Sequence, residues 1–312
     1  MRSRTPRLAA GLVAVLALSL VPGAVSAQSP AASGGPVTVT DADGNTVTIT
    51  DSSKVATLGG VITETAYALG AADQIVAVDA SSYYPPEATQ TKAVLPYYRM
   101  LAAEPVLAAG PTLILGTKEV GPPEVVQQLK DAGVTVALLP RDLTTDGSKA
   151  LITAVGHALG RDTEAAALVA QVDQDLSDAS ALVATATSKP KVMMLLLPPG
   201  APMLVSGTGT EADTMIGLAG GVNAVTDFPG YVPLTPEAAV AAAPDVILTT
   251  SSSLQAAGGI DGLLATPGIA DTPAGKAKAI VAIEDLELLG FGPRVGAAIM
   301  DLATQIHPEL AQ

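Results

Sequence analysis

The sequence predicts an α/β protein with two Rossmann-like lobes, each built on a central parallel sheet, joined by a long rigid helix around a ligand cleft. Residues 101–117 and 234–250 are identical at eight of seventeen positions, and each copy indicates a short helix, a proline and an apolar strand. Strands alternate with helices in both halves, as in parallel sheets covered by helices. A chain that repeats one unit predicts two similar lobes, and clefts between domains bind small ligands.

The first 27 residues have the pattern of a secretory signal peptide. Arg2, Arg4 and Arg7 form a basic start, residues 8–21 are apolar, and Val25-Ser26-Ala27 is a small-residue cleavage site. A membrane anchor is the competing interpretation, but the apolar run is shorter than the ~20 residues that span a bilayer. We therefore expect cleavage near Ala27 and export to the periplasm.

The composition restricts the partners and the core. The signal peptide holds three of the 16 basic residues and none of the 30 acidic ones, so the exported chain is strongly acidic. Nucleic acid is excluded as a partner on that ground, and no membrane-inserted segment is expected after cleavage. The chain lacks cysteine and tryptophan and has only two phenylalanines. Its core must therefore consist of Ala, Val, Leu and Ile, which makes clustered tyrosines conspicuous.

The first half of the exported chain is expected to form a short linker and the first lobe. Residues 28–36 are rich in Ser, Ala, Gly and Pro and predict a disordered linker, followed by an N-terminal lobe at 37–146. Residues 37–50 alternate in polarity around Asp43-Gly44-Asn45, which predicts a hairpin. Further expected elements are strands at 55–58, 75–78, 111–116 and 134–138 and helices from about Thr63 and at 124–132.

The second half is expected to contain a helical connection and a second lobe. Residues 147–188 carry apolar residues at helical spacing, interrupted only by Gly160, and predict a connecting segment of one or two helices. The C-terminal lobe at 189–312 then repeats the order glycine loop, acidic helix start, strand and aspartate. Its expected elements are strands at 191–197 and 222–225, a glycine loop at 206–209, a helix from about Thr210 and a closing helix at 293–303.

Four of the six tyrosines lie within one short stretch. Tyr83, Tyr84, Tyr97 and Tyr98 stand among prolines and next to Arg99, on loops beyond strand ends, where α/β sheets bind ligands. A phenol is a poor metal ligand unless its phenolate is stabilised, and ferric iron or a nearby guanidinium can do this. Tyrosinate is a known axial ligand of heme iron. The alternative is that these rings only pack at a loop while Arg99 is solvated.

Two glutamates occupy matching positions in the predicted lobes. Glu64 and Glu211 each lie early in a helix that follows a glycine-rich loop. Stabilisation by the helix dipole, worth ~0.3–1 kcal/mol, explains one such glutamate. A matched pair of acidic knobs could instead dock onto arginines of a two-fold partner, and both interpretations stay open.

An enzyme is difficult to assemble from the remaining residues. His157, on an apolar stretch of the connecting segment, is expected to be structural, and His307 to be exposed. HExxH, a P-loop and GxGxxG are absent. A carboxylate pair, Glu284 and Asp285, could serve an exported enzyme, but a solvated turn is the simpler interpretation. We therefore predict a protein that is not an enzyme.

Seven segments of the chain carry a resemblance to a known family. They are GGVITETAYALGA (59–71), AVDASSYYPPEA (77–88), LPYYRMLAAEPVLAAGPTLILGT (95–117), GTEADTMIGLAGGVNA (209–224), GYVPLTPEAAVAAAPDVILTTS (230–251), GGIDGLLATPGIADTPAGK (258–276) and LELLGFGPR (286–294). Together they are similar to the periplasmic heme-binding proteins of bacterial heme ABC importers, in the helical-backbone class III of solute-binding proteins, and the resemblance covers residues 37–305. Cobalamin and siderophore binders belong to the same class.

The resemblance implies a heme site. The heme-ligating tyrosine of the family stands in a Tyr-x-Arg-x-Leu-x-Ala-Glu context, which places Tyr97 as the axial ligand of the iron and Arg99 as its basic neighbour. Pro96 replaces the usual glycine and Tyr98 follows, so a slip of one residue makes Tyr98 the alternative ligand. Tyr231, in a Gly-Tyr-x-Pro context, is the best candidate in the second lobe. Tyr84 and Met203 complete the expected heme-binding residues.

The resemblance also implies a function and partners. A monomer would capture heme as transported ligand and deliver it to the permease dimer of an ABC transporter for iron acquisition. Glu64 and Glu211 would meet the permease, one from each lobe, with Asp213 close enough to replace Glu211. The rival cargo is a siderophore or a cobalamin-type ligand, but these bring their own metal ligands. The tyrosine–arginine loop therefore favours heme.

Overall fold

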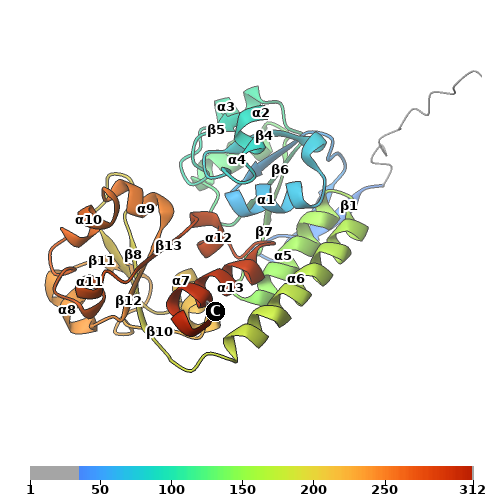
Figure 1. Ribbon diagram of the computed structural model, residues 1–312. Helices are drawn as coiled ribbons and strands as arrows, with labels where there is room; N and C mark the ends of the chain where they lie inside the picture. Colours follow the sequence, from blue (N-terminus) through green and yellow to red (C-terminus); the bar gives the residue numbers. More distant parts are fainter. Residues whose placement is uncertain (1–34, 311–312) are drawn as a thin grey trace, which may run out of the picture. The chain divides into compact units, whose positions relative to one another are not determined.

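The computed structural model describes residues 35–310, drawn in colour in Figure 1. The expected signal peptide and all but the last two residues of the expected linker lie outside the described residues. The chain begins with the predicted hairpin, in which β1 (Val37–Thr40) pairs antiparallel with β2 (Thr46–Ile49). Its turn is held by Asp41, whose Oδ1 accepts the N–H groups of Asp43 and Asn45 at 3.0 and 2.8 Å.

The first half of the chain forms a parallel sheet, as predicted. Its five strands are arranged in the order β5-β4-β3-β6-β7. The central strands β3, β4 and β6 are mostly apolar and almost entirely buried, because helices cover both faces of such a sheet. The strands are β3 (Val55–Leu58), β4 (Ile75–Asp79), β5 (Ala93–Leu95), β6 (Leu113–Thr117) and β7 (Thr135–Leu139).

Four α-helices and one short 3₁₀ helix connect these strands. The first helix, α1, begins at Gly60, three residues before the expected start. The reason is Gly59, whose φ of +100° turns the chain directly after β3. Gly60 itself has no room for a side chain, because a Cβ would lie 2.5 Å from the carbonyl oxygen of Ser81. The helices are α1 (Gly60–Ala68), η1 (Ala72–Gln74), α2 (Glu87–Thr91), α3 (Ala103–Ala108) and α4 (Pro123–Asp131).

Two helices stand where the sequence predicts the rigid connection. They are α5 (Thr145–Ala158) and α6 (Asp162–Val183), which pack against each other and are separated at Gly160, whose φ is +67°. A Cβ on Gly156 would lie only 2.4 Å from the Cβ of Ala165, so the two backbones approach closely. Helix α5 contacts α1 of the first half, and α6 packs along α13 (Val295–Ile306) of the second (Figure 1). The helices thus connect the two halves through packing as well as through the chain.

The second half forms a mixed sheet in the order β11-β9-β8-β12-β13, with β10 also paired to β8. Strands β10, β8, β12 and β13 are parallel, whereas β9 runs antiparallel to β8 and β11 runs antiparallel to β9. The reversal follows from residues 198–200, Pro-Pro-Gly, which end β8 and turn the chain back with a φ of +73° at Gly200. The strands are β8 (Lys191–Leu196), β9 (Leu204–Ser206), β10 (Val222–Asn223), β11 (Tyr231–Pro233), β12 (Val246–Thr250) and β13 (Ile280–Ile283).

The internal repeat forms the same unit twice, as predicted. Helix α3 followed by β6 in the first half corresponds to α8 (Pro236–Ala242) followed by β12 in the second. In both units the proline after the helix ends it and the apolar run enters the centre of a sheet. The remaining helices are α7 (Glu211–Leu218), α9 (Ser251–Ala256), α10 (Gly259–Leu264), α11 (Pro273–Ala277), α12 (Asp285–Leu289) and η2 (Pro308–Leu310).

One of the two histidines differs from its expected setting. His307 is fully buried, so the expectation that it is exposed is wrong. Its Nδ1 lies 3.1 Å from the Ser188 hydroxyl, and its Nε2 lies 3.0 Å from the carbonyl oxygen of Ala219. The chain after α13 folds against the end of α7, which covers the ring. His157 is partly exposed and its Nδ1 contacts Asp162 at 2.9 Å, which ties the end of α5 to the start of α6.

Helices from both halves share one apolar cluster. Buried side chains of α1, α5 and α6 belong to the same cluster as those of α7 and α13, so burial of apolar surface also holds the two halves together. Within residues 35–310, no helix combines the length and the apolar character that a membrane span requires.

Candidate ligand-binding site

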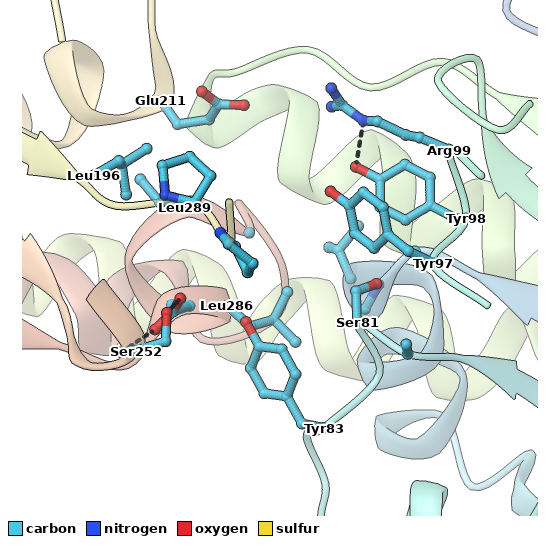
Figure 2. Close-up of a pocket in the computed structure, with 18 of the residues that line it drawn as sticks. Ser81, Tyr83, Tyr97, Tyr98, Arg99, Leu196, Glu211, Ser252, Leu286 and Leu289 are labelled. Carbon is cyan, nitrogen blue, oxygen red and sulfur yellow. Dashed lines mark hydrogen bonds between the residues drawn. The ribbon is translucent and has the colours of Figure 1, made fainter. Parts of the chain in front are cut away.

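A cavity of about 890 Å³ opens where loops from both halves meet (Figure 2). This volume lies in the upper range of small-molecule pockets, ~300–1,000 Å³. Most of its wall comes from segments that follow the carboxyl ends of β3, β4, β5, β7, β8, β12 and β13, the usual ligand edge of α/β sheets. Apolar groups, among them Leu196, Leu286 and Leu289, form much of the wall between the tyrosines of one half and Glu211 of the other.

A buried aspartate positions the tyrosine loop. Asp79 ends β4 and is fully buried; its Oδ2 accepts the backbone N–H of Tyr98 at 3.1 Å, and its Oδ1 accepts that of Gly59 at 2.8 Å. The Gly121 N–H donates to the carbonyl oxygen of Tyr98 at 3.0 Å. Asp79 directly follows the strand predicted at 75–78 and was not among the predicted site residues. Its position at the carboxyl edge of the sheet was the signal that could have identified it as a site residue.

The structure brings Tyr97, Tyr98 and Arg99 together at the cavity wall. The two rings lie with centroids 4.6 Å apart at an interplanar angle of 54°. The Nε–H of Arg99 donates to the Tyr98 hydroxyl at 3.1 Å, and both phenol oxygens point to the same side (Figure 2). We expected Arg99 to reach the Tyr97 oxygen. In this structure the guanidinium instead binds the phenol next to it.

Tyr97 is the more accessible of the two phenols and is 41% exposed. Burial raises its pKa to about 12, the hydrogen bond with Tyr98 adds to the rise, and the charge of Arg99 opposes it. The group is therefore a neutral phenol at physiological pH. A metal ion that binds its oxygen must displace the proton.

The other two tyrosines of the cluster, Tyr83 and Tyr84, take different positions relative to the cavity. Tyr83 lines the cavity, and burial followed by the nearby Asp285 carboxylate raises its pKa. Tyr84 was expected at the ligand but is not part of the cavity wall; its ring stacks on Arg294, with the guanidinium carbon 3.8 Å from the ring centroid. Met203 also lies outside the wall, against the apolar cluster of the second half. These two expected contacts are absent from the described cavity.

The second half presents Tyr231 beside a carboxylate. The Tyr231 hydroxyl makes a long hydrogen bond of 3.5 Å to Glu211 Oε2, while Glu211 Oε1 pairs with Arg141 Nη1 at 3.5 Å. Burial, and then the Glu211 charge, raise the pKa of Tyr231. A carboxylate next to a phenol disfavours the phenolate. Tyr231 is consequently a weaker candidate for a metal ligand than Tyr97.

Arg141 is a site residue that the sequence analysis missed. It follows β7, lines the cavity and donates from Nη2 to the carbonyl oxygens of Leu289 and Gly290 at 2.8 and 3.2 Å. Its buried Nε has no hydrogen-bond partner among residues 35–310. A lone arginine in a loop carries no pattern that predicts this position, because its partners are about 70 to 150 positions further along the chain.

Glu64 is held inside the protein by Arg294. The glutamate side chain is 3% exposed, and the arginine donates from Nε to Oε1 at 2.8 Å and from Nη2 to Oε2 at 3.3 Å. Burial raises the pKa of Glu64, while the hydrogen bond and charge of Arg294 lower it. Glu211 faces the cavity and Arg141. Neither glutamate is therefore a free acidic knob in this structure, since each is paired with an arginine from the other half.

The carboxylate pair considered for an enzyme is also committed to other contacts. Glu284 caps α12 by accepting the N–H groups of Leu286 and Glu287 at 2.8 and 2.9 Å, and it receives Arg294 Nη2 at 2.8 Å. Asp285 accepts hydrogen bonds from the backbone N–H and the hydroxyl of Ser252. The pair stands at the start of a helix, where the free backbone amide groups and the helix dipole stabilise carboxylates.

Comparison with known proteins gives one family and several relatives. The model of the family described as "Periplasmic binding protein" matches residues 55–286. Among solved structures, the apo form of the periplasmic heme-binding protein RhuT from Roseiflexus sp. RS-1 is 40% identical, with a TM-score of 0.80. The match covers 84% of this chain and 100% of RhuT.

Two curated relatives are more distant. The uncharacterized ABC transporter substrate-binding lipoprotein YvrC of Bacillus subtilis is 28% identical, over 88% of this chain and 86% of YvrC. The cobalamin-binding protein of Halobacterium salinarum is 27% identical, over 93% of this chain and 79% of its own length. The similar proteins thus include a heme binder as well as a cobalamin binder.

Proposed function

The chain belongs to the periplasmic binding protein family, and from that premise we propose that it captures ferric heme in its cavity and delivers it to an ABC permease. The observation that carries the proposal is the Tyr97 phenol at the wall of a large, partly apolar cavity, with Tyr98 and Arg99 beside it. Its similarity to a heme-binding protein, at 40% identity, supports the same cargo.

Tyr97 supplies the axial oxygen to the iron. Ferric iron favours the phenolate, and the Tyr98–Arg99 pair stabilises the negative charge. The porphyrin faces pack on apolar side chains such as Leu286 and Leu289, which removes apolar surface from water. The protein acts as a monomer in the periplasm, and because the cargo is bound and released unchanged, it is not an enzyme.

A cobalamin-type ligand is the second candidate. The similarity to the Halobacterium protein favours it, and a siderophore would use the same cavity. These ligands carry metal centres with their own axial or chelating groups, so they have no need of a phenolate. The tyrosine–arginine arrangement at Tyr97 favours heme for this reason.

Titration with hemin is the experiment that separates these cargoes. We expect the purified chain to give a Soret shift and a tyrosinate charge-transfer band with hemin, and no comparable binding of cyanocobalamin. The two ligands are titrated in parallel and followed by absorbance and calorimetry. Binding of cyanocobalamin with no spectral response to hemin would replace heme with a corrinoid as the cargo.

Delivery to a permease is the second part of the proposal, supported by the similarity to an ABC transporter substrate-binding lipoprotein. Glu64 and Glu211 remain the proposed contacts, although each is paired within the protein. A permease arginine that takes either glutamate would have to replace Arg294 or Arg141. Docking would therefore replace an ion pair within the protein by an ion pair with the permease, so the charge of the buried glutamate would stay paired.

Binding to the permease tests these contacts. We expect the Glu64→Gln/Glu211→Gln double variant to bind permease in nanodiscs at least tenfold more weakly, because charge pairs at interfaces are worth ~1.5–7 kcal/mol. The matched control is Glu104→Gln/Glu237→Gln, which removes the exposed glutamates of the two repeated helices, one from each half. Equal permease affinity of the wild type and the Glu64/Glu211 variant would remove the docking role.

A further inference from the structure

We propose that Tyr98 is not a second iron ligand but the hydrogen-bond donor through which Arg99 stabilises the Tyr97 phenolate. This inference rests on the proposed heme-binding function and assigns a positioning role to a residue beside the ligand. It makes the three consecutive residues Tyr97, Tyr98 and Arg99 one hydrogen-bonded chain that ends at the iron.

Tyr98 is fixed in place, as a positioning residue must be. Its backbone N–H is bound by the buried Asp79 carboxylate at 3.1 Å, and its carbonyl oxygen accepts the Gly121 N–H at 3.0 Å. Its ring packs against the apolar cluster of the first half, and Arg99 holds its hydroxyl. Tyr97 has the same loop position but a more exposed ring, which leaves its oxygen accessible from the cavity.

The hydroxyl of Tyr98 can accept a hydrogen bond from Arg99 and donate one to Tyr97. A phenol has one hydrogen to donate and lone pairs to accept. Since the Tyr98 oxygen already accepts the Arg99 Nε–H at 3.1 Å, its own hydrogen is free to turn toward the adjacent Tyr97 oxygen. The centroid distance of 4.6 Å and the common direction of the two hydroxyls in Figure 2 bring these oxygens to the same side.

Metal binding makes Tyr98 the hydrogen-bond donor to Tyr97. In the free protein the Tyr97 phenol carries its own proton. When iron takes the Tyr97 oxygen, the proton leaves to solvent and Tyr98 becomes the donor. Arg99 polarises that donor, because hydrogen bonds in a chain strengthen one another.

The intervening phenol also limits how strongly Arg99 weakens the ligand. A guanidinium in direct contact with the phenolate would neutralise much of the charge that binds the iron. A neutral hydroxyl between them stabilises the phenolate and leaves it a strong donor. Hydrogen bonds to a ligand of this kind tune both the affinity and the reduction potential of a metal centre.

A double-mutant cycle on the full chain tests the chain of hydrogen bonds. Tyr98→Phe, Arg99→Met and the double variant are loaded with hemin, and the heme dissociation rate and the charge-transfer band are measured. We expect Tyr98→Phe to keep the band, shift its energy and speed dissociation about tenfold, the scale of a lost charge-assisted bond. The double variant should dissociate no faster than Tyr98→Phe alone, because Arg99 acts through Tyr98.

Two outcomes would overturn the proposal. Loss of the band in Tyr98→Phe but not in Tyr97→Phe would make Tyr98 the ligand. If Arg99→Met sped heme dissociation by the same factor in the Tyr98→Phe variant as in the wild type, Arg99 would contact Tyr97 directly. If the wild type bound no hemin, the proposed function itself would fail, and this result is distinct from both.

Discussion

Replacement of Arg294 by methionine is expected to lower the free energy of unfolding by about 3–5 kcal/mol, the usual cost of removing one partner of a buried ion pair. The Arg294 guanidinium binds three carboxylates, those of Glu64, Glu284 and Glu287, at 2.8, 2.8 and 2.9 Å. Its side chain is 21% exposed and that of Glu64 is 3% exposed, so solvent compensates little for the loss. Urea unfolding followed by circular dichroism measures the change.

A surface cation provides the matched control. Lys149 pairs with Asp146 and Asp173, each at 2.9 Å, but these carboxylates are largely exposed. Lys149→Met should therefore change the free energy of unfolding by about 1 kcal/mol or less. Glu64→Gln introduced into Arg294→Met should restore part of the stability, because it removes the buried charge that was left unpaired. Equal losses for Arg294→Met and Lys149→Met would contradict this account of the cluster.

Replacement of Tyr97 by phenylalanine is expected to abolish the tyrosinate charge-transfer band and to weaken heme binding by at least about 100-fold. Loss of a hydrogen bond to a metal ligand already costs ~10–100-fold, and this change removes the ligand oxygen itself. The ring stays, so packing against Tyr98 is preserved. Competition for heme with an acceptor protein of known affinity measures the change. Tyr231→Phe serves as the control and should keep the band.

The pH dependence gives a second test of the same oxygen. Because the pKa of Tyr97 is raised to about 12, the free site is protonated over the physiological range, and iron must displace that proton. Heme that enters with a water on its iron should therefore bind more tightly as pH rises, by up to about tenfold per unit. Tyr97→Phe should lack that slope. The same slope in both proteins would show that the proton comes from another group.

Local sequence patterns were sufficient for the repeated helix–strand unit and for the tyrosine loop. Residues 101–117 and 234–250 each contain a helix, a breaking proline and an apolar strand, and such periodicity depends only on neighbours in the chain. The position of Tyr97 and Tyr98 at the cavity followed from their place after a strand of a parallel sheet. Both features are set by short stretches of sequence.

These local patterns did not predict which single polar groups are buried. Glu64 is enclosed by Arg294, which lies 230 residues further along the chain, and His307 by Ser188 and the carbonyl of Ala219. The pairing of Arg99 with Tyr98 depends on side-chain rotamers, which the spacing of residues does not determine. Contacts of this kind depend on how the two halves pack together, and no local propensity encodes them.

The Asp79 carboxylate links the start of α1 to the tyrosine loop. One oxygen holds the amide at which α1 starts, and the other holds the amide of Tyr98. Helix α1, which bears Glu64, and the loop proposed to bind the cargo are thus anchored by the same carboxylate. A displacement of α1 would therefore act on the anchor of the loop that carries the Tyr97 phenol, the proposed iron ligand.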